Sequence, residues 1–207
     1  MRILVVGATG ALGRDIMAEA LRAGHQTTAV VRDPGRAALP AQAQILAGDV
    51  LNAQSLVTAV RGTDAVICAL GTPSPRRPST LLREGGENLV AAMTQEGSRR
   101  LVCVTLLGAG PSRSSASFFY RAIILRVLAP MVPDKEAQEK VVRASGLDWT
   151  LVRPPRFTGG RARGDIRVIA EGQSGRAGHV VRRDLARFVV DCASKELYVG
   201  QAVAVGS

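Results

Sequence analysis

The chain has 207 residues, a length suited to one domain with a full hydrophobic core. Hydrophobic residues make up 46% and charged residues 21%, as is usual in soluble globular proteins. The net charge of +10 is compatible with nucleic acid, a membrane surface or an anionic cofactor. The arginines are spread through the chain, so we expect most of them to be solvated. No expected helix concentrates them beside aromatic residues, which argues against direct nucleic-acid binding.

Short apolar runs and amphipathic segments alternate along the chain. The expected strands span residues 3–6, 26–31, 44–47, 65–70, 100–106, 149–152, 166–170 and 202–205. The expected helices span residues 11–23, 52–60, 79–95, 115–129, 134–144 and 183–193, with Asn52 as an N-cap. Apolar strands that alternate with helices are typical of parallel sheets covered on both faces. The sequence therefore predicts an α/β fold, a Rossmann-type doubly wound parallel sheet with three α/β/α layers, as a single domain over residues 1–207.

The cysteines and the apolar segments indicate where the protein resides. Cys68, Cys103 and Cys192 lack metal-type spacing, and we expect free buried thiols and no metal site. The first strand runs directly into a glycine turn, which is not the pattern of a signal peptide. The apolar stretch 118–132 contains two arginines and a proline, so it is too short and too charged to span a bilayer. We expect a soluble, cytoplasmic protein, a monomer or small homo-oligomer, without membrane contact.

Three loops follow the fourth, fifth and sixth expected strands and are rich in Gly, Pro, Ser and Arg. Open α/β sheets bind ligands at the carboxyl ends of their parallel strands, and these loops lie at that edge. We expect them to form the cleft for the molecule that is acted on, at residues near 73–78, 108–132 and 155–165.

The strongest motif is Gly7-x-x-Gly10-x-x-Gly13, directly after the first strand and directly before a helix. Gly7 permits a tight turn, Gly10 lets the backbone approach a pyrophosphate, and Gly13 lets the helix pack against the sheet. The helix N-terminus then offers free N–H groups and a partial positive charge to phosphates. Because the motif has the strand–turn–helix context that it requires, it predicts dinucleotide binding.

The end of the second strand indicates which dinucleotide binds. An NAD site places an acidic residue there for the ribose 2′-hydroxyl, whereas this strand ends in Val31-Arg32. Arg32 and Arg36 offer guanidinium groups for a 2′-phosphate, which favours NADP(H). Two alternatives stay open: both arginines are ordinary surface residues, or Asp33 turns inward and accepts from a ribose.

Several segments together resemble a known superfamily. They are Gly7 to Gly13, Val31-Arg32-Asp33, Gly48-Asp49-Val50, residues 64–67, Gly71-Thr72, residues 84–92 and residues 145–155. The chain resembles the atypical short-chain dehydrogenase/reductases over nearly its whole length. Within them it is similar to the NmrA-like NAD(P)-binding proteins, and most of all to the biliverdin-IXβ reductase/flavin reductase group.

The resemblance implies a set of cofactor contacts. Gly7, Thr9, Gly10 and Leu12 would line the pyrophosphate, and Arg32 and Arg36 would hold the 2′-phosphate. Asp49 and Val50 would border the adenine, and Gly71 and Thr72 would pass beside the ribose. The further expected contacts are Ala11, Leu70, Thr105, Lys135, Pro155, Arg156 and Phe157. For Asp49, a turn residue that closes the third strand is an equal alternative.

The sequence departs from this superfamily where carbonyl-reducing members keep a Tyr-x-x-x-Lys pair and a serine. Lys135 resembles the lysine, but Met131 stands at the tyrosine position and cannot donate a proton. The fifth strand ends Thr105-Leu106 in place of a pair of serines. Arg156 stands where the flavin reductase group has a histidine, and Tyr120 is an alternative proton donor. The candidate catalytic residues are therefore Thr105, Lys135 and Arg156.

The missing proton donors favour hydride transfer to a conjugated ring, which depends on stacking more than on acid–base groups. An apolar lid of Phe118, Phe119, Leu125 and Phe157, with Arg156, would suit a planar anionic acceptor; alternatively the phenylalanines are core and Arg156 is surface. We expect an NADPH-dependent reductase of a flavin, quinone or tetrapyrrole-like acceptor. The alternative is a non-catalytic NmrA-like NAD(P)-sensing regulatory protein that acts through a protein partner.

Overall fold

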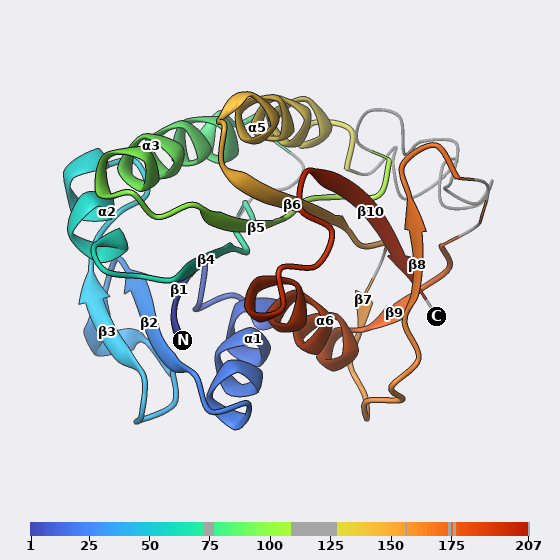
Figure 1. Ribbon diagram of the computed structural model, residues 1–207, viewed down its shortest axis with the longest axis horizontal. Coiled ribbons are helices and arrows are strands. Elements are labelled where there is room, and N and C mark those ends of the chain that lie inside the picture. Colours follow the sequence, from blue (N-terminus) through green and yellow to red (C-terminus); the bar gives the residue numbers. More distant parts are fainter. Residues whose placement is uncertain (73–76, 109–127, 156, 174, 176, 207) are drawn as a thin grey trace.

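An eight-stranded sheet forms the middle layer of the protein (Figure 1). The computed structural model describes residues 1–72, 77–108, 128–155, 157–173, 175 and 177–206. Neighbouring strands are parallel except for the last pair, β10 and β8. In spatial order the strands are β3 (Gln44–Ala47), β2 (Gln26–Val31), β1 (Arg2–Val6), β4 (Ala65–Cys68), β5 (Arg100–Val104), β6 (Asp148–Arg153), β10 (Gln201–Gly206) and β8 (Arg167–Ala170).

Helices cover both faces of this sheet. Helices α1 (Ala11–Arg22) and α6 (Arg182–Ser194) lie side by side on one face. Helices α2 (Ala53–Val60), α3 (Leu81–Glu96) and α5 (Val132–Ala144) lie on the other (Figure 1). The predicted doubly wound parallel sheet with three layers is confirmed.

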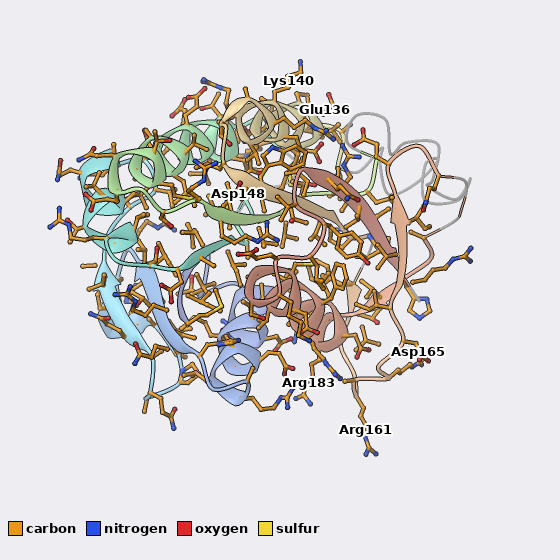
Figure 2. The ribbon with its side chains drawn as sticks, in the orientation of Figure 1. Glu136, Lys140, Asp148, Arg161, Asp165 and Arg183 are labelled. Carbon is orange, nitrogen blue, oxygen red and sulfur yellow. The ribbon has the colours of Figure 1, made fainter. Side chains whose placement is uncertain are left out.

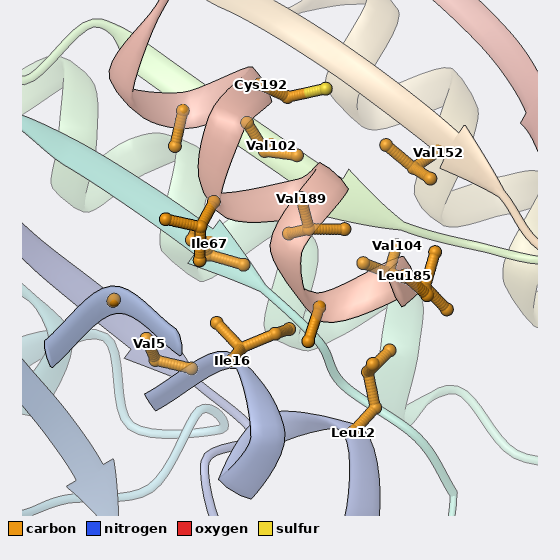
Figure 3. Packing of buried hydrophobic residues seen from close by; sticks show 14 of the residues in the cluster. Val5, Leu12, Ile16, Ile67, Val102, Val104, Val152, Leu185, Val189 and Cys192 are labelled. Carbon is orange, nitrogen blue, oxygen red and sulfur yellow. The ribbon is translucent and has the colours of Figure 1, made fainter. Parts of the chain in front are cut away.

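The two core layers follow from the alternation of side chains along each strand. Val5, Ile67 and Val102 point toward α1 and α6, where they meet residues such as Ile16 and Val189 (Figure 3). Their chain neighbours, including Leu4, Val66 and Leu101, belong to the opposite cluster with residues of α2, α3 and α5. Because successive side chains alternate between faces, a strand that is buried on both sides must be apolar throughout.

Several basic side chains project from the outside of the molecule (Figure 2). Figure 2 shows Lys140 pointing outward from α5, and Arg161 and Arg183 projecting at the opposite side. The three cysteines are free and buried. Within the described ranges, no helix is long and apolar enough to cross a membrane, and no three potential metal ligands gather.

Several details differ from the sequence expectations. Strands β4 and β5 end at Cys68 and Val104, two residues before the expected ends. A 3-10 helix, η1 (Pro34–Arg36), and a two-stranded sheet of β7 (Phe157–Thr158) with β9 (Val180–Val181) were not expected, because elements of two or three residues show no periodicity. The expected helix at 115–129 lies almost entirely outside the described residues, as does most of the loop at 73–78.

Two buried aspartates hold elements together across the chain. The Asp134 carboxylate on α5 accepts hydrogen bonds from the backbone N–H groups of Leu82 and Arg83, at 3.1 and 2.9 Å, and so caps α3 from outside. The Asp184 carboxylate on α6 accepts from the N–H groups of Arg163 and Gly164, at 2.9 and 3.0 Å. Carboxylates stabilise a helix N-terminus because its first N–H groups have no partner within the helix.

Candidate functional site

The glycine turn after β1 has the geometry that its sequence predicts. Gly7 has a φ of +88°, and a Cβ there would lie 2.6 Å from the carbonyl oxygen of Ala69. A Cβ on Gly13 would lie 2.1 Å from the carbonyl oxygen of Gly7. These two positions therefore accept only glycine, because the obstacles are backbone atoms. Gly10 is the N-cap of α1 and makes no side-chain cap, so the first N–H groups of this helix face the turn.

A cleft of about 390 Å³ opens at the carboxyl ends of β1, β2, β3 and β4. Nine of the predicted cofactor contacts line it: Gly7, Thr9, Gly10, Arg32, Asp49, Val50, Leu70, Gly71 and Thr72. Its other lining residues, which were not among the predicted contacts, are Val30, Val31, Gly48, Leu51, Ala69 and Leu81. Of these, Val31, Gly48, Leu51 and Ala69 adjoin a predicted contact and Val30 lies two residues from one, so their position at the strand ends was the signal that could have found them.

Two further predicted contacts on α1 lie beside the cleft lining. Leu12 is only 7% exposed and packs in the core between the sheet and α6. Ala11 is exposed in the first turn of the helix. Neither side chain lines the cleft, although the backbone of both belongs to the helix end that faces it.

The arginines after β2 differ in position. Arg32 lines the cleft. Arg36 ends the short η1 helix with a side chain that is 90% exposed, and its Nε lies 3.3 Å from the Asp33 carboxylate. That carboxylate also accepts a hydrogen bond from the Gly35 N–H at 3.1 Å. Asp33 is therefore bound within its own turn in this structure.

The turn after β3, residues 48–51, forms one wall of the cleft. The Asp49 carboxylate accepts from the Leu51 N–H at 3.0 Å, and the Ser55 hydroxyl donates to the Asp49 carbonyl at 2.9 Å. The Asn88 side chain on α3 donates to the Val50 carbonyl at 2.9 Å. Asp49 is thus a turn residue that also lines the cleft. Leu51 is 50% exposed at this wall, an apolar surface suited to a flat ring.

Lys135, a predicted cofactor contact, does not line the cleft but lies beside its inner end, the end at Leu70, between two strand ends. Its ammonium donates to the carbonyl oxygens of Leu70 at 2.9 Å and Val104 at 3.0 Å, and to Oε1 of Gln138 at 3.2 Å. The residue is 3% exposed. An ammonium has three N–H groups, so these partners use all of them. Lys135 thereby ties the ends of β4 and β5 to α5.

Thr105, a predicted cofactor contact that does not line the cleft either, directly follows β5 and is 6% exposed. Its hydroxyl donates to Oε1 of Glu139 at 2.6 Å, and Glu139 is held by Arg153 through Nε at 3.0 Å and Nη2 at 2.5 Å. Arg153 is only 2% exposed. Burial alone would lower the pKa of Arg153, but hydrogen bonding and Coulombic attraction to Glu139 outweigh it and the pKa is raised. The pair is therefore charged, with Thr105 as a third member.

The remaining predicted residues are less closely associated with the cleft. Pro155 is buried two residues after β6 (Asp148–Arg153), and Phe157 is 40% exposed on β7; neither lines the cleft. Leu106 and Met131, which replace the expected serine and tyrosine, belong to the same apolar cluster. The predictions for Arg156, Phe118, Phe119, Tyr120 and Leu125 lie outside the described residues.

Comparison with known proteins places this site in a family. The sequence pattern of the NAD(P)H-binding family matches residues 7–196. A photosystem II assembly factor, Ycf39 of Synechocystis sp., is 30% identical over 166 residues, which cover 77% of this chain and 46% of the relative. The chain spans about half the length, or less, of the first curated relatives that it matches.

Solved structures share the fold over the entire chain. A short-chain dehydrogenase/reductase from Veillonella parvula in complex with NADP superposes with a TM-score of 0.82 at 18% identity, over 100% of this chain and 94% of that one. ChuY, an anaerobillin reductase from Escherichia coli O157:H7, superposes with a TM-score of 0.79 at 22% identity, over 100% and 97% of the two chains. At these identities the similarity shows the fold alone.

Proposed function

The chain belongs to the NAD(P)H-binding family, and we propose that it is an NADPH-dependent reductase that transfers hydride to a flavin or a similar conjugated planar acceptor. The acceptor would be a small molecule of the flavin, quinone or tetrapyrrole class. The proposed setting is the cytoplasm, where NADPH and free thiols such as the three buried cysteines coexist.

The cleft supports dinucleotide binding through its shape and its polar groups. The Gly7 turn admits no side chain, and the uncapped N-terminus of α1 suits a pyrophosphate. The wall of Val50 and Leu51 suits the adenine, and Arg32 suits a 2′-phosphate. Arg36 would join Arg32 by exchanging its exposed ion pair with Asp33 for the phosphate. When bound, the dinucleotide supplies the hydride, and the chain holds it in place.

We expect Arg32→Ala to weaken NADPH binding by about 1.5–3 kcal/mol, the range for hydrogen bonds to charged groups, and to leave NADH binding nearly unchanged. The physical reason is that only NADPH carries the phosphate that Arg32 would bind. Calorimetric titration with both dinucleotides measures the difference. Arg61→Ala is the matched control, because Arg61 is an exposed arginine that pairs with Glu96 away from the cleft. Equal affinities for NADPH and NADH in the unmodified protein would contradict the preference for NADPH.

One observation favours a conjugated acceptor over a ketone. Every polar hydrogen of the Lys135 and Thr105 side chains is donated to another group of the protein. The side chains of Met131 and Leu106 have no polar hydrogen. Ketone reduction develops negative charge on oxygen and requires a donor within reach. A flavin accepts hydride at a ring nitrogen and can take the remaining proton from water. Arg156 and Phe157 remain proposed contacts of the acceptor.

Oxidation of NADPH by the purified protein with a panel of acceptors tests this function. We expect measurable reduction of FMN or riboflavin, with quinones and tetrapyrroles as further candidates, and negligible turnover of simple ketones. Robust ketone reduction that disappears in Tyr120→Phe would show that a relocated tyrosine supplies the proton.

A second candidate function is an NAD(P)-sensing regulatory protein that acts through a protein partner. The hydrogen bonds that Thr105 and Lys135 donate within the protein also favour a sensor, because a sensor needs no proton donor. The related Ycf39 is named an assembly factor, which is also a role played through other proteins. Tight NADPH binding without turnover of any acceptor would support the sensor and contradict the reductase.

A further inference from the structure

The direction of one hydrogen bond fixes what Thr105 can offer to a ligand. A hydroxyl has a single hydrogen, and that of Thr105 is donated to Glu139 at 2.6 Å. Glu139 accepts it as a carboxylate, because Arg153 holds both of its oxygens from a position that is 98% buried. Rotating the hydroxyl outward would leave this buried carboxylate without one of its donors. Thr105 therefore presents only its lone pairs to anything that approaches it.

Thr105 lies next to the inner end of the cleft. Strands β4 and β5 are neighbours with Cys68 opposite Cys103, so the chain beyond Cys68 runs beside the chain beyond Cys103. The Lys135 ammonium lies within 3.0 Å of both the Leu70 and the Val104 carbonyl oxygens. Leu70 lines the cleft, and Thr105 directly follows Val104. Thr105 and Lys135, the two candidate catalytic residues that the structure describes at this end, have no side-chain hydrogen left for a ligand.

From this geometry we propose that the Glu139–Arg153 pair locks Thr105 as a hydrogen-bond acceptor, and that the inner end of the cleft selects a ligand group that carries an N–H. The inference rests on the proposed function, under which that group is the carboxamide of the nicotinamide ring. Glu139 and Arg153 are then positioning residues, and Thr105 determines specificity. A carbonyl or alkoxide oxygen placed there would meet lone pairs and be disfavoured.

This arrangement can be tested by comparing a dinucleotide that carries a carboxamide with one that carries an acetyl group. The acetyl group keeps the carbonyl but has a methyl group in place of the NH₂. We expect the unmodified chain to bind NADP⁺ about fivefold more tightly than its 3-acetylpyridine analogue in calorimetric titration, the value of one neutral hydrogen bond. Thr105→Val should bring the ratio of the two affinities to about one, with little change in affinity for the analogue. Thr105→Ser should restore the ratio.

Two more variants separate this role from a structural one. In Glu139→Gln, Arg153 would hold the amide oxygen and the amide NH₂ would face Thr105, so the hydroxyl would turn and donate outward. We expect the affinity ratio to fall toward one in this variant, although the dinucleotide still binds. Thr28→Val is the control, because it removes a hydroxyl that donates to Gln44 at 3.3 Å outside the cleft, and the ratio should stay unchanged.

Equal binding of both dinucleotides by the unmodified chain, or a Thr105→Val variant that keeps the preference, would overturn this inference and leave the proposed function standing. A chain that binds neither dinucleotide would overturn the proposed function itself.

Discussion

Replacement of Gly13 by alanine should abolish measurable dinucleotide binding and lower the stability of the fold. The added Cβ would lie 2.1 Å from the Gly7 carbonyl oxygen and 2.8 Å from the Ala8 Cα, and neither backbone atom can rotate away. Helix α1 must then move off the turn, which withdraws its N-terminus from the cleft. Overpacking of this kind costs about 1–3 kcal/mol, and more where backbone is the obstacle. Calorimetric titration with NADPH and thermal unfolding measure the two effects.

Gly159→Ala is the matched control for this prediction. A Cβ at Gly159, in the segment after β7, would meet no atom within 4 Å, so stability and dinucleotide affinity should stay as they are. If Gly13→Ala bound NADPH within about twofold of the unmodified chain, the N-terminus of α1 would not be the pyrophosphate site.

Removal of the Glu139 carboxylate should destabilise the protein by about 3–5 kcal/mol, the usual cost of leaving one member of a buried ion pair without its partner. In Glu139→Ala, Arg153 would keep only the Glu171 carboxylate, 3.7 Å from its Nη1, while its guanidinium stays 2% exposed. The Thr105 hydroxyl would lose its acceptor as well. Equilibrium unfolding in urea measures the change in the free energy of unfolding.

The double replacement of Glu139 by Leu and Arg153 by Met separates charge from packing. Buried ion pairs exchanged for apolar residues of similar volume are often neutral in stability, so the double variant should recover most of the loss. A loss under about 1 kcal/mol in the single variant would mean that Glu171 or water replaces Glu139 as the partner of Arg153.

The layered fold and the dinucleotide-binding turn could be predicted from local patterns in the sequence. Strands β2 and β3 have the bounds that their apolar runs predict, because alternation and run length are local properties. Asn52 caps α2 as expected, with its side chain accepting from the Gln54 and Ser55 N–H groups. The glycine turn could be predicted in the same way. A Cβ at any of its three glycines would meet backbone atoms, either of the turn itself or of the residues just after the neighbouring strand β4.

The hydrogen-bond partners of the polar groups at the inner end of the cleft follow from long-range packing and could not be predicted in this way. The sequence marks Thr105 and Lys135 as candidate catalytic residues, but it does not show where their hydrogens go. Glu139 lies 34 residues from Thr105, and the Leu70 carbonyl lies 65 residues from Lys135. No periodicity or spacing encodes such partners, because they are set by which helix packs over which strand end. In the folded chain Thr105 donates to Glu139 and Lys135 joins the ends of two strands, roles that residue type alone leaves undetermined.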